Sequence, residues 1–385
     1  MKILSVGGGS GGHVTPLVAV LNEINKELPD SDVRFWCDQH FAFEAQRIMN
    51  NYDDSIRIQK VIAGKFRRYH HLSKVQHLII PSIIFPNIRD TFLVLTGIVQ
   101  SFFRMVLWRP DVVFAKGGYV CLPVGIAAWL LRIPVVIHDS DIHPGLTNRL
   151  LAPFATRIAT GMPLEHYNYP QQKTTYVGTP ISSAFHPLDS RRRNEIKRAL
   201  GFDTSRPLVV VTGGGQGARP INDAIMIHLK ELLGHTNILL LSGSAQYDEL
   251  RSLTPQDDPR FLLKDFMVQG MHEVIGAADI VVSRAGATSL LELAAAARPT
   301  IVVPSKRLVW QVKHVRSYID TEAVISLDED AFIDAADTSL RDTILHLLQS
   351  STLRERLAHN IHQHARPHAA RDMAHLIIGV AKKRG

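Results

Sequence analysis

Cysteine is nearly absent from this chain. The 385 residues include two cysteines, Cys37 and Cys121, which lie far apart and outside any paired-cysteine motif. A disulfide framework needs an even set of cysteines at short spacings, and a zinc ribbon needs two closely spaced pairs. The sequence therefore argues against both, and a reducing compartment is the expected environment.

Long apolar runs and a secretory signal are also missing. The stretch 91–103 is bracketed by Arg89, Asp90 and Arg104, so no window reaches about 18 uninterrupted apolar residues. The chain opens on a short strand pattern that runs directly into glycines, whereas a signal peptide needs an apolar segment and a small-residue cleavage site. We therefore expect any membrane contact to be peripheral.

Positive charge exceeds negative charge. The 43 lysines and arginines outnumber the 36 acidic residues, which gives a formal net charge of +7. Such an excess points to an anionic partner, but it does not distinguish nucleic acid, phosphates and an acidic membrane surface. The sequence contains no recognisable nucleic-acid recognition module, so we expect no nucleic-acid partner. The length predicts two or three domains.

A glycine-rich turn follows the first predicted strand. Residues 2–6 are apolar, and Gly7-Gly-Gly-Ser-Gly-Gly-His13 then opens a predicted helix. Glycines let the backbone approach a phosphate closely, and the free N–H groups of a helix N-terminus attract anions. A dinucleotide-binding fingerprint is the rival interpretation, weakened because the turn lacks the G-x-G-x-x-G register. His13 is the titratable side chain of this turn, either as a general base or in a structural role.

The same unit recurs about two hundred residues later. Residues 207–212 are typical of a strand and end at Gly213, and a third unit at 280–295 joins an apolar strand, Gly286 and a helix. Glu292 is the odd residue on the apolar face of that helix. An acid beside a phosphate site suits the hydroxyls of a ribose, while the alternative is a surface glutamate on an ordinary helix. The repeated units predict two α/β halves with a cleft between them.

A polar cluster follows another predicted strand. Residues 134–137 are apolar, and His138-Asp-Ser-Asp-Ile-His143 comes next. Side chains at the carboxyl ends of parallel strands face the cleft of an open α/β sheet. We favour substrate contact for this cluster over metal binding or helix capping by Asp141. The histidines between 359 and 375 lack metal-ligand spacing, and we expect no metal site.

A basic and aromatic segment precedes an apolar one. Residues 64–74 carry lysines, arginines and aromatic residues, and residues 78–85 are rich in isoleucine. One interpretation is a loop followed by core helices. The other is a patch on an anionic bilayer, with cations at headgroup level and apolar side chains dipping inward. This patch comprises Lys65, Phe66, Arg67, Arg68, Lys74, Ile83, Ile84 and Phe85.

Six motifs occur in order along nearly the whole chain. They are Gly7-Gly-Gly-Ser-Gly-Gly-His-Val-Thr-Pro16, Lys116-Gly-Gly-Tyr-Val120, Pro134-Val-Val-Ile-His138, Gly145-Leu-Thr-Asn-Arg149, Gly213-Gly-Gly-Gln-Gly-Ala-Arg219 and Arg284-Ala-Gly-Ala-Thr-Ser-Leu-Leu-Glu-Leu293. Together they closely resemble the MurG family, the peripheral-membrane N-acetylglucosaminyltransferases that convert lipid I to lipid II in peptidoglycan synthesis.

The resemblance implies a GT-B architecture of the α/β class, in which two Rossmann-like domains face a central cleft. We expect an acceptor and membrane domain at residues 1–178, a donor domain at 179–365, and a C-terminal helix at about 366–385 that packs back on the first domain. The implied reaction is an inverting, metal-independent transfer of N-acetylglucosamine to the muramoyl 4-hydroxyl, with no cofactor. The implied partners are UDP-N-acetylglucosamine, a polyprenyl-diphosphate-linked muramoyl-peptide acceptor, the cytoplasmic face of an anionic membrane and cell-wall synthesis proteins.

The resemblance also assigns roles to individual residues. Glu292 would bind the uridine ribose, Gln311 would touch the donor sugar, and His13 would meet the acceptor diphosphate or its attacking hydroxyl. The donor set is Asp141, Ser182, Gly214, Gly215, Gln216, Gly286, Ala287, Thr288, Glu292 and Gln311. The acceptor set is Ser10, Gly11, Gly12, Gly117, Gly118, Tyr119 and His138. We expect His13 to act as the base, with Asp139 as the second choice.

The chain departs from the family pattern at several of these positions. The family's His-Glu-x-Asn reads His138-Asp-Ser-Asp141, so a carboxylate replaces an amide that would grip the sugar. Gly215 stands where the glycine loop commonly has a serine, Ser182 stands where an arginine is expected, and the residues around Gln311 differ. Two alternative functions stay open: a GT-B transferase for another lipid or small-molecule acceptor, and a non-catalytic UDP-binding scaffold.

Overall fold

Two parallel sheets organise the chain. The computed structural model describes residues 1–8, 11–50, 56–67, 80–141, 144–215, 217–254, 258–267, 269–334 and 336–383. The chain divides into unit 1, which comprises Met1–Ser182 and His368–Gly385, and unit 2, which comprises Ser183–Pro367. Each unit is a parallel α/β sheet, and this confirms the predicted fold class of two Rossmann-like domains.

Unit 1 holds a seven-stranded sheet with the strand order β3-β2-β1-β4-β5-β6-β7. Every neighbouring pair is parallel, and Ile3 at its centre pairs with Val33 on one side and Val112 on the other. The strands are β1 (Lys2–Gly7), β2 (Asp32–Asp38), β3 (Arg57–Val61), β4 (Val112–Gly117), β5 (Val135–Asp139), β6 (Arg157–Thr160) and β7 (Thr174–Tyr176). The helices are α1 (Gly11–Glu27), α2 (Ala42–Asn50), α4 (Pro81–Trp108), α5 (Cys121–Leu130), α6 (Leu146–Leu151) and α16 (Ala369–Lys382).

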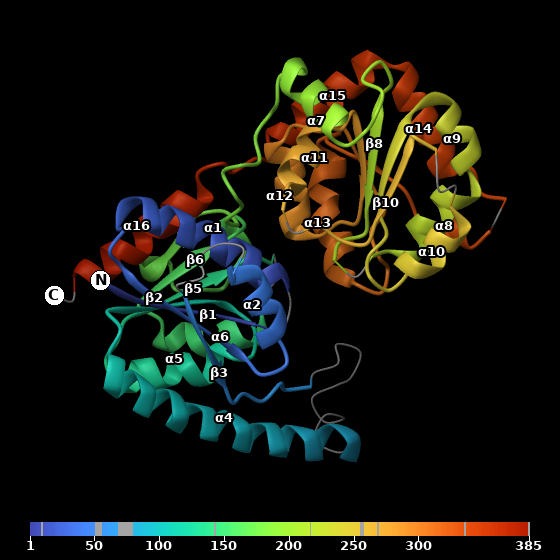
Figure 1. Cartoon of the computed structure of the whole chain (residues 1–385). Coiled ribbons are helices and arrows are strands. Elements are labelled where there is room, and N and C mark those ends of the chain that lie inside the picture. Colours follow the sequence, from blue (N-terminus) through green and yellow to red (C-terminus); the bar gives the residue numbers. More distant parts are fainter. Residues whose placement is uncertain are drawn as a thin grey trace. The chain divides into compact units, whose positions relative to one another are not determined.

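Both faces of the first sheet are covered by helices. Successive side chains of a strand point to opposite faces, so Ile3 joins a core with α1, α2 and α16, whereas Leu4 joins a core with α4 and α5 (Figure 1). Strands that are buried on both faces are continuous apolar runs, which is the pattern of residues 112–115 and 135–137. Apolar burial on both sides therefore holds the sheet.

Helix α16 belongs to unit 1 although the chain reaches it after completing unit 2. Met373, Ala374 and Ile377 are fully buried and pack beside α1 (Figure 1). At the exposed edge of this contact, His375 Nε2 lies 2.5 Å from Glu27 Oε1. The apolar face of the C-terminal helix thus covers a surface that the first helix leaves open.

Unit 2 holds a six-stranded parallel sheet with the order β10-β9-β8-β11-β12-β13. Val209 and Val210 of its central strand enter opposite cores, as Ile3 and Leu4 do in unit 1. The strands are β8 (Leu208–Thr212), β9 (Asn237–Leu241), β10 (Phe261–Lys264), β11 (Ile280–Ser283), β12 (Thr300–Val302) and β13 (Ile325–Ser326). The helices are α7 (Ser190–Ala199), α8 (Arg219–Ile227), α9 (Leu229–His235), α10 (Tyr247–Leu253), α11 (Met271–Ala277), α12 (Ala287–Ala295), α13 (Val309–Asp320), α14 (Ser339–Gln349) and α15 (Ser351–His362).

Candidate functional site

The turns after β1 and β4 touch each other at the carboxyl edge of the first sheet. These strands are neighbours, and a Cβ atom on Gly118 would lie 2.3 Å from the carbonyl oxygen of Gly8. Gly118 has φ of +91°, a region that favours glycine. Tyr119 follows, and burial together with a hydrogen bond to Asp38 raises the pKa of its hydroxyl. The structure thus places Gly117, Gly118 and Tyr119 together beside Gly8.

The first turn of α1 contains Gly11, Gly12 and His13, but their side chains lie outside the described part of the structure. Ser10, Arg68, Lys74 and Gln216 also lie outside the described residues. The role of His13 therefore stays a prediction. What the structure does show is that α1 begins at the same sheet edge as the turn after β4, since β1 and β4 are neighbours.

His138 and Asp139 are buried at the end of β5 rather than open to a ligand. His138 is fully buried, its Nε2 donates to the Gly178 carbonyl oxygen at 2.8 Å, and burial lowers its pKa well below 6.5. Asp139 is 3% exposed, and its Oδ2 accepts from the Tyr169 hydroxyl at 2.9 Å and from the Gly145 N–H at 3.3 Å. Burial raises the pKa of Asp139 to about 6.

These contacts argue against two of the predicted roles. Asp139, the second choice for the base, anchors the loop before α6 (Leu146–Leu151) by accepting hydrogen bonds from Tyr169 and Gly145. His138 ties β5 to Gly178 and has no exposed surface for an acceptor. The sequence pattern placed both residues at the correct edge of the sheet, but only the tertiary contacts show that they face the protein.

Lys116 is a buried cation at this edge that the sequence reasoning missed. It is 1% exposed at the end of β4, and its Nζ donates to Ser140 Oγ at 2.6 Å. Burial lowers its pKa to about 8. The available signal was a lysine that closes the apolar run 112–115 directly before two glycines, because charged side chains are rarely buried without a reason.

In unit 2, the turn after β8 and the start of α12 lie at one sheet edge, since β8 and β11 are neighbours. Gly214 has φ of +81°, and its N–H donates to Thr212 Oγ1 at 3.2 Å. Gly215 lies beside the Phe266 ring. Gly286 caps α12 without a side-chain hydrogen bond, and Ala287 and Thr288 form the first turn, where unpaired N–H groups favour an anion. These predicted donor residues thus follow two neighbouring strands at the same edge of the sheet.

Glu292 lies on α12 and has an unusual environment. The residue is partly exposed, yet desolvation by the surrounding protein raises the pKa of its carboxyl group from 4.5 to about 8. Within the described ranges, no residue donates a hydrogen bond to this carboxyl group. A buried acid without a donor is costly unless it binds a ligand, so Glu292 has the character of a binding residue.

Gln311 fastens the loop between β12 and α13. It is 8% exposed, and its Oε1 accepts from the Ser305 N–H at 3.0 Å. The same loop is held by Glu329, which accepts from the Lys306 N–H at 2.7 Å and pairs with Arg284 Nη1 at 2.7 Å. Sequence reasoning missed Glu329, because nothing in its local pattern indicates a contact with Arg284, which lies 45 residues earlier in the chain.

Two predicted donor residues belong to the other unit. Asp141 and Ser182 lie in unit 1, and Ser182 is its last residue before unit 2 begins. Both are partly exposed, and the Asp141 carbonyl oxygen accepts from the Tyr167 hydroxyl at 2.7 Å. Their contact with a donor stays a prediction. Over the ranges that the structure describes, no group of three or more histidine, cysteine, aspartate or glutamate side chains is arranged to hold a metal ion.

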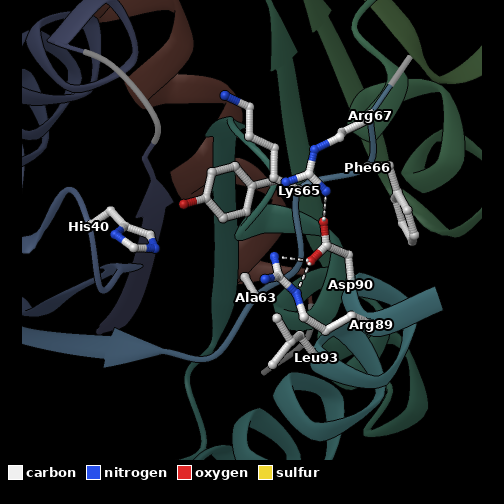
Figure 2. A pocket seen from close by; sticks show the side chains of 9 residues that line it. His40, Ala63, Lys65, Phe66, Arg67, Arg89, Asp90 and Leu93 are labelled. Atoms are coloured by element: carbon white, nitrogen blue, oxygen red, sulfur yellow. Dashed lines mark hydrogen bonds and ion pairs between the residues drawn. The ribbon is translucent and has the colours of Figure 1, made fainter. Parts of the chain in front are cut away.

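A basic pocket of about 520 Å³ lies beside Tyr119 in unit 1. Figure 2 shows the guanidinium groups of Arg67 and Arg89 converging on Asp90. Asp90 is 1% exposed, accepts from Arg89 Nη2 at 2.9 Å, and lies 3.7 Å from Arg67 Nη1. The pocket is lined by His40, Ala63, Lys65, Phe66, Arg67, Arg89, Asp90, Leu93 and Tyr119. One carboxylate offsets one of these cations, so the lining carries net positive charge.

Helix α4 has a buried face and an exposed apolar face. Val94, Met105 and Trp108 pack into the core of unit 1, so α4 covers the sheet even though its length and composition suffice to cross a membrane (Figure 1). On the outside, large apolar residues recur every three or four positions, which places them on one side of a helix. This α4 apolar stripe comprises Phe85, Ile88, Phe92, Leu95, Val99, Phe103, Val106 and Leu107, each at least half exposed.

The predicted membrane patch overlaps the start of this stripe in part. Phe85 is 70% exposed and Ile84 is partly exposed, but Ile83 is 3% exposed and cannot enter a bilayer, so its predicted role is wrong. Lys65 is exposed, and Phe66 and Arg67 are partly exposed. The helical period of α4 decides this, because Ile83 and Phe85 lie on different faces of the helix.

Both halves of the chain match one enzyme family. Residues 3–160 match the glycosyltransferase family 28 N-terminal domain, and residues 208–373 match the glycosyltransferase family 28 C-terminal domain. The chain is 31% identical over 359 residues to the UDP-N-acetylglucosamine–N-acetylmuramyl-(pentapeptide) pyrophosphoryl-undecaprenol N-acetylglucosamine transferase of Bacillus cytotoxicus, with 92% of each chain covered. It is 34% identical over 306 residues to the transferase of the same name from Clostridium kluyveri, with 80% of this chain and 79% of the relative covered.

Solved structures show the same fold. MurG of Acinetobacter baumannii superposes with a TM-score of 0.70 at 22% identity, over 98% of this chain and 99% of that one. The UDP-GlcNAc 2-epimerase of Neisseria meningitidis, bound to UDP-GlcNAc, superposes with a TM-score of 0.63 at 12% identity, over the full length of both chains.

Proposed function

Because this chain belongs to the MurG family within glycosyltransferase family 28, we propose that it transfers N-acetylglucosamine from UDP-N-acetylglucosamine to the muramoyl 4-hydroxyl of lipid I, giving lipid II. The observation that carries this proposal is the 31% identity to the Bacillus cytotoxicus transferase over 92% of both chains. Both the N-terminal and the C-terminal family domains are matched, which supports assigning one substrate to each unit.

The donor is assigned to unit 2. The N–H groups at the start of α12 and in the turn after β8 lie at one sheet edge, where they stabilise the charge that develops on departing UDP. Glu292 lies on the same helix and accepts hydrogen bonds from the ribose hydroxyls, which supply the donors that it lacks within the described structure. The sugar then projects from the diphosphate with its anomeric carbon open to attack.

The acceptor is assigned to unit 1. Its diphosphate lies on the glycine turns at Gly8 and Gly118 and on the N-terminus of α1. The muramoyl 4-hydroxyl attacks the anomeric carbon from the side opposite UDP, which inverts the configuration as the bond to UDP breaks. His13 takes the hydroxyl proton, because it lies in the first turn of α1 and Asp139 is committed to Tyr169 and Gly145.

Unit 1 also provides the membrane contact. The α4 apolar stripe enters the interface of the bilayer at its cytoplasmic face, while the lysine and arginine side chains of the basic pocket lie at headgroup level. The acceptor is a lipid, so an enzyme that binds its diphosphate benefits from lying on the same surface. The contact is peripheral because the opposite face of α4 is part of the protein core.

A transfer assay tests the proposed function. The purified protein is incubated with UDP-N-acetylglucosamine and a lipid I analogue, and we expect UDP release together with a disaccharide product. Parallel reactions with simple glycolipids and small aglycones test the alternative acceptors. Turnover on those acceptors alone would show that the protein is a transferase for another acceptor. UDP binding in calorimetry without any turnover would indicate a non-catalytic scaffold.

A further inference from the structure

Lys116 is buried in unit 1 with few partners. Its side chain is 1% exposed, and within the described ranges its Nζ has one hydrogen-bond acceptor, Ser140 Oγ, at 2.6 Å. A protonated amine has three donors, and burying one is unfavourable unless opposite charge or hydrogen bonds compensate. Lys116 lies where β4 ends, directly before Gly117 and Gly118, so the reason for its burial must be sought at the acceptor edge.

The hydrogen bonds around Lys116 make it the first donor in a chain of buried polar groups. His138 Nε2 lies 2.8 Å from the Gly178 carbonyl oxygen, which only accepts, so Nε2 carries the proton and Nδ1 is an acceptor. Ser140 Oγ lies 3.5 Å from Nδ1 and donates to it, and in turn accepts from Lys116 Nζ. The chain Lys116–Ser140–His138–Gly178 is therefore consistent in every donor and acceptor, and Lys116 donates at its first step.

Two carboxylates flank Ser140. Asp139 and Asp141 lie on either side of it in the chain, and Lys116 Nζ donates to Ser140 between them. Their charges nevertheless act on the amine, Asp141 more strongly than Asp139. Two further titratable groups near Lys116 within the described residues are neutral. Burial lowers the pKa of His138 well below 6.5, and burial raises the pKa of the Cys121 thiol to about 12. Lys116 therefore places a cation near the two carboxylates in the described part of the turn after β5.

The diphosphate of the acceptor would bind next to these two carboxylates. The glycine turns that are assigned to the acceptor follow β1 and β4, and β5 is the next strand of the sheet. Like charges that are brought together in a partly dehydrated cleft repel each other over several ångströms. The carboxylate at Asp141 stands where the family pattern has an amide, so this chain carries a repulsion that an amide would not create.

We propose that Lys116 is a positioning and charge-compensating residue for the acceptor: from beneath the turn it offsets Asp141 and Asp139 and holds Ser140, so that a diphosphate can occupy the neighbouring glycine turns. The inference rests on the proposed function for the identity of the acceptor. It assigns to Lys116 no contact with the reacting atoms, and its effect is on acceptor binding rather than on the chemical step.

The test is a pair of variants and their combination. Lys116→Met, which keeps the length and apolar stem of the side chain, should raise the KM for the lipid I analogue about tenfold with little change in kcat or in the KM for UDP-N-acetylglucosamine. Asp141→Asn in the Lys116→Met background should restore most of the lost acceptor affinity, because the charge to be offset is gone. A double variant as impaired as Lys116→Met would overturn the proposal, as would a rise confined to the donor KM.

Two controls distinguish an effect of lost charge on acceptor binding from an effect of lost stability. Lys197 is a second lysine with 5% exposure, but it pairs with Asp279 in unit 2, so Lys197→Met should leave the acceptor KM unchanged. If Lys116→Met does not fold, the single variant Asp141→Asn still tests the proposal, because removing this carboxylate should tighten acceptor binding. Weaker acceptor binding by Asp141→Asn would contradict the proposal.

A binding experiment distinguishes failure of this inference from failure of the proposed function. Calorimetric titration with geranyl diphosphate measures diphosphate binding without any transfer. If the wild type binds the probe and Lys116→Met binds it about tenfold more weakly, the charge argument holds even where no sugar is transferred. Equal binding by the two proteins would refute it, whatever the transfer assay shows.

Discussion

Replacing Glu292 by glutamine should make the protein more stable at alkaline pH. Above pH 4.5 the unfolded chain has lost the proton of this carboxyl group, whereas the folded protein keeps it until about pH 8. The free energy of unfolding therefore falls as the pH rises across this window. The rise from 4.5 to about 8 sets an upper limit of about 5 kcal/mol, and because part of Glu292 is exposed we expect about 1–2 kcal/mol.

Glutamine does not titrate, so the variant escapes this loss. Thermal unfolding followed by circular dichroism should give a Tm about 3–6 °C above the wild type at pH 8.5, and nearly equal Tm values at pH 4.5. The matched control is Glu329→Gln. Burial raises the pKa of Glu329, but hydrogen bonds from Lys306 and Arg284 outweigh burial, and the pKa of Glu329 is lowered overall. This control should therefore lose stability at pH 8.5. A Glu292→Gln protein no more stable than the wild type at that pH would refute the reasoning.

The same substitution should weaken donor binding. An ionised carboxylate accepts hydrogen bonds from two ribose hydroxyls, whereas an amide accepts at one oxygen only. We expect the affinity for UDP to fall about tenfold in the variant, and the wild-type affinity to rise as the pH passes through about 8 and Glu292 ionises. Calorimetric titration with UDP measures both. A variant that is more stable yet binds UDP less well is the behaviour expected of a binding residue.

Three further outcomes are expected. Phe103→Ser, on the α4 apolar stripe at 62% exposure, should reduce cosedimentation with anionic liposomes several-fold without lowering the Tm. Phe43→Ser on α2, at 78% exposure, should leave cosedimentation unchanged. Equal binding by both variants would argue against a role of the stripe in membrane binding. Gly118→Ala should lower the free energy of unfolding by about 2 kcal/mol in urea titrations, because its Cβ would meet the Gly8 carbonyl, whereas Gly145→Ala meets nothing within 4 Å. His13→Ala should chiefly lower kcat in the transfer assay, and turnover at the wild-type rate would remove His13 from the role of base.

Local patterns were enough to predict the two sheets and the turns at their edges. Apolar runs such as 208–211 predict buried strands on their own, because a parallel strand covered on both faces needs apolar residues at every position. Glycines directly after such runs predict turns at the carboxyl edge, and this holds for Gly118 and Gly214, both of which have positive φ. Glu292 was recognisable as an acid on an apolar helix face.

The orientation of the polar residues at those edges was beyond local patterns. Asp139 belongs to the correct turn but is bound by Tyr169, 30 residues later, and Glu329 meets Arg284 across 45 residues. Sequence spacing places a residue on an element, whereas the partner of its side chain depends on which distant segment packs against that element. For this reason sequence spacing makes Asp139 the second choice for the base after His13, although its carboxylate accepts hydrogen bonds from Tyr169 and Gly145.

What the amino-acid sequence determined by itself is the alternation of apolar strands, glycine turns and helices, because each follows from the chemistry of neighbouring residues. What only the tertiary structure decided is which polar groups are buried and with whom. The helical period put Ile83 inside and Phe85 outside, and the pairing of β4 with β5 brought Lys116 beneath Ser140. A side chain becomes buried and finds its hydrogen-bond partners when segments far apart in the chain pack together. The shifted pKa values of Lys116 and Glu292 depend on that packing.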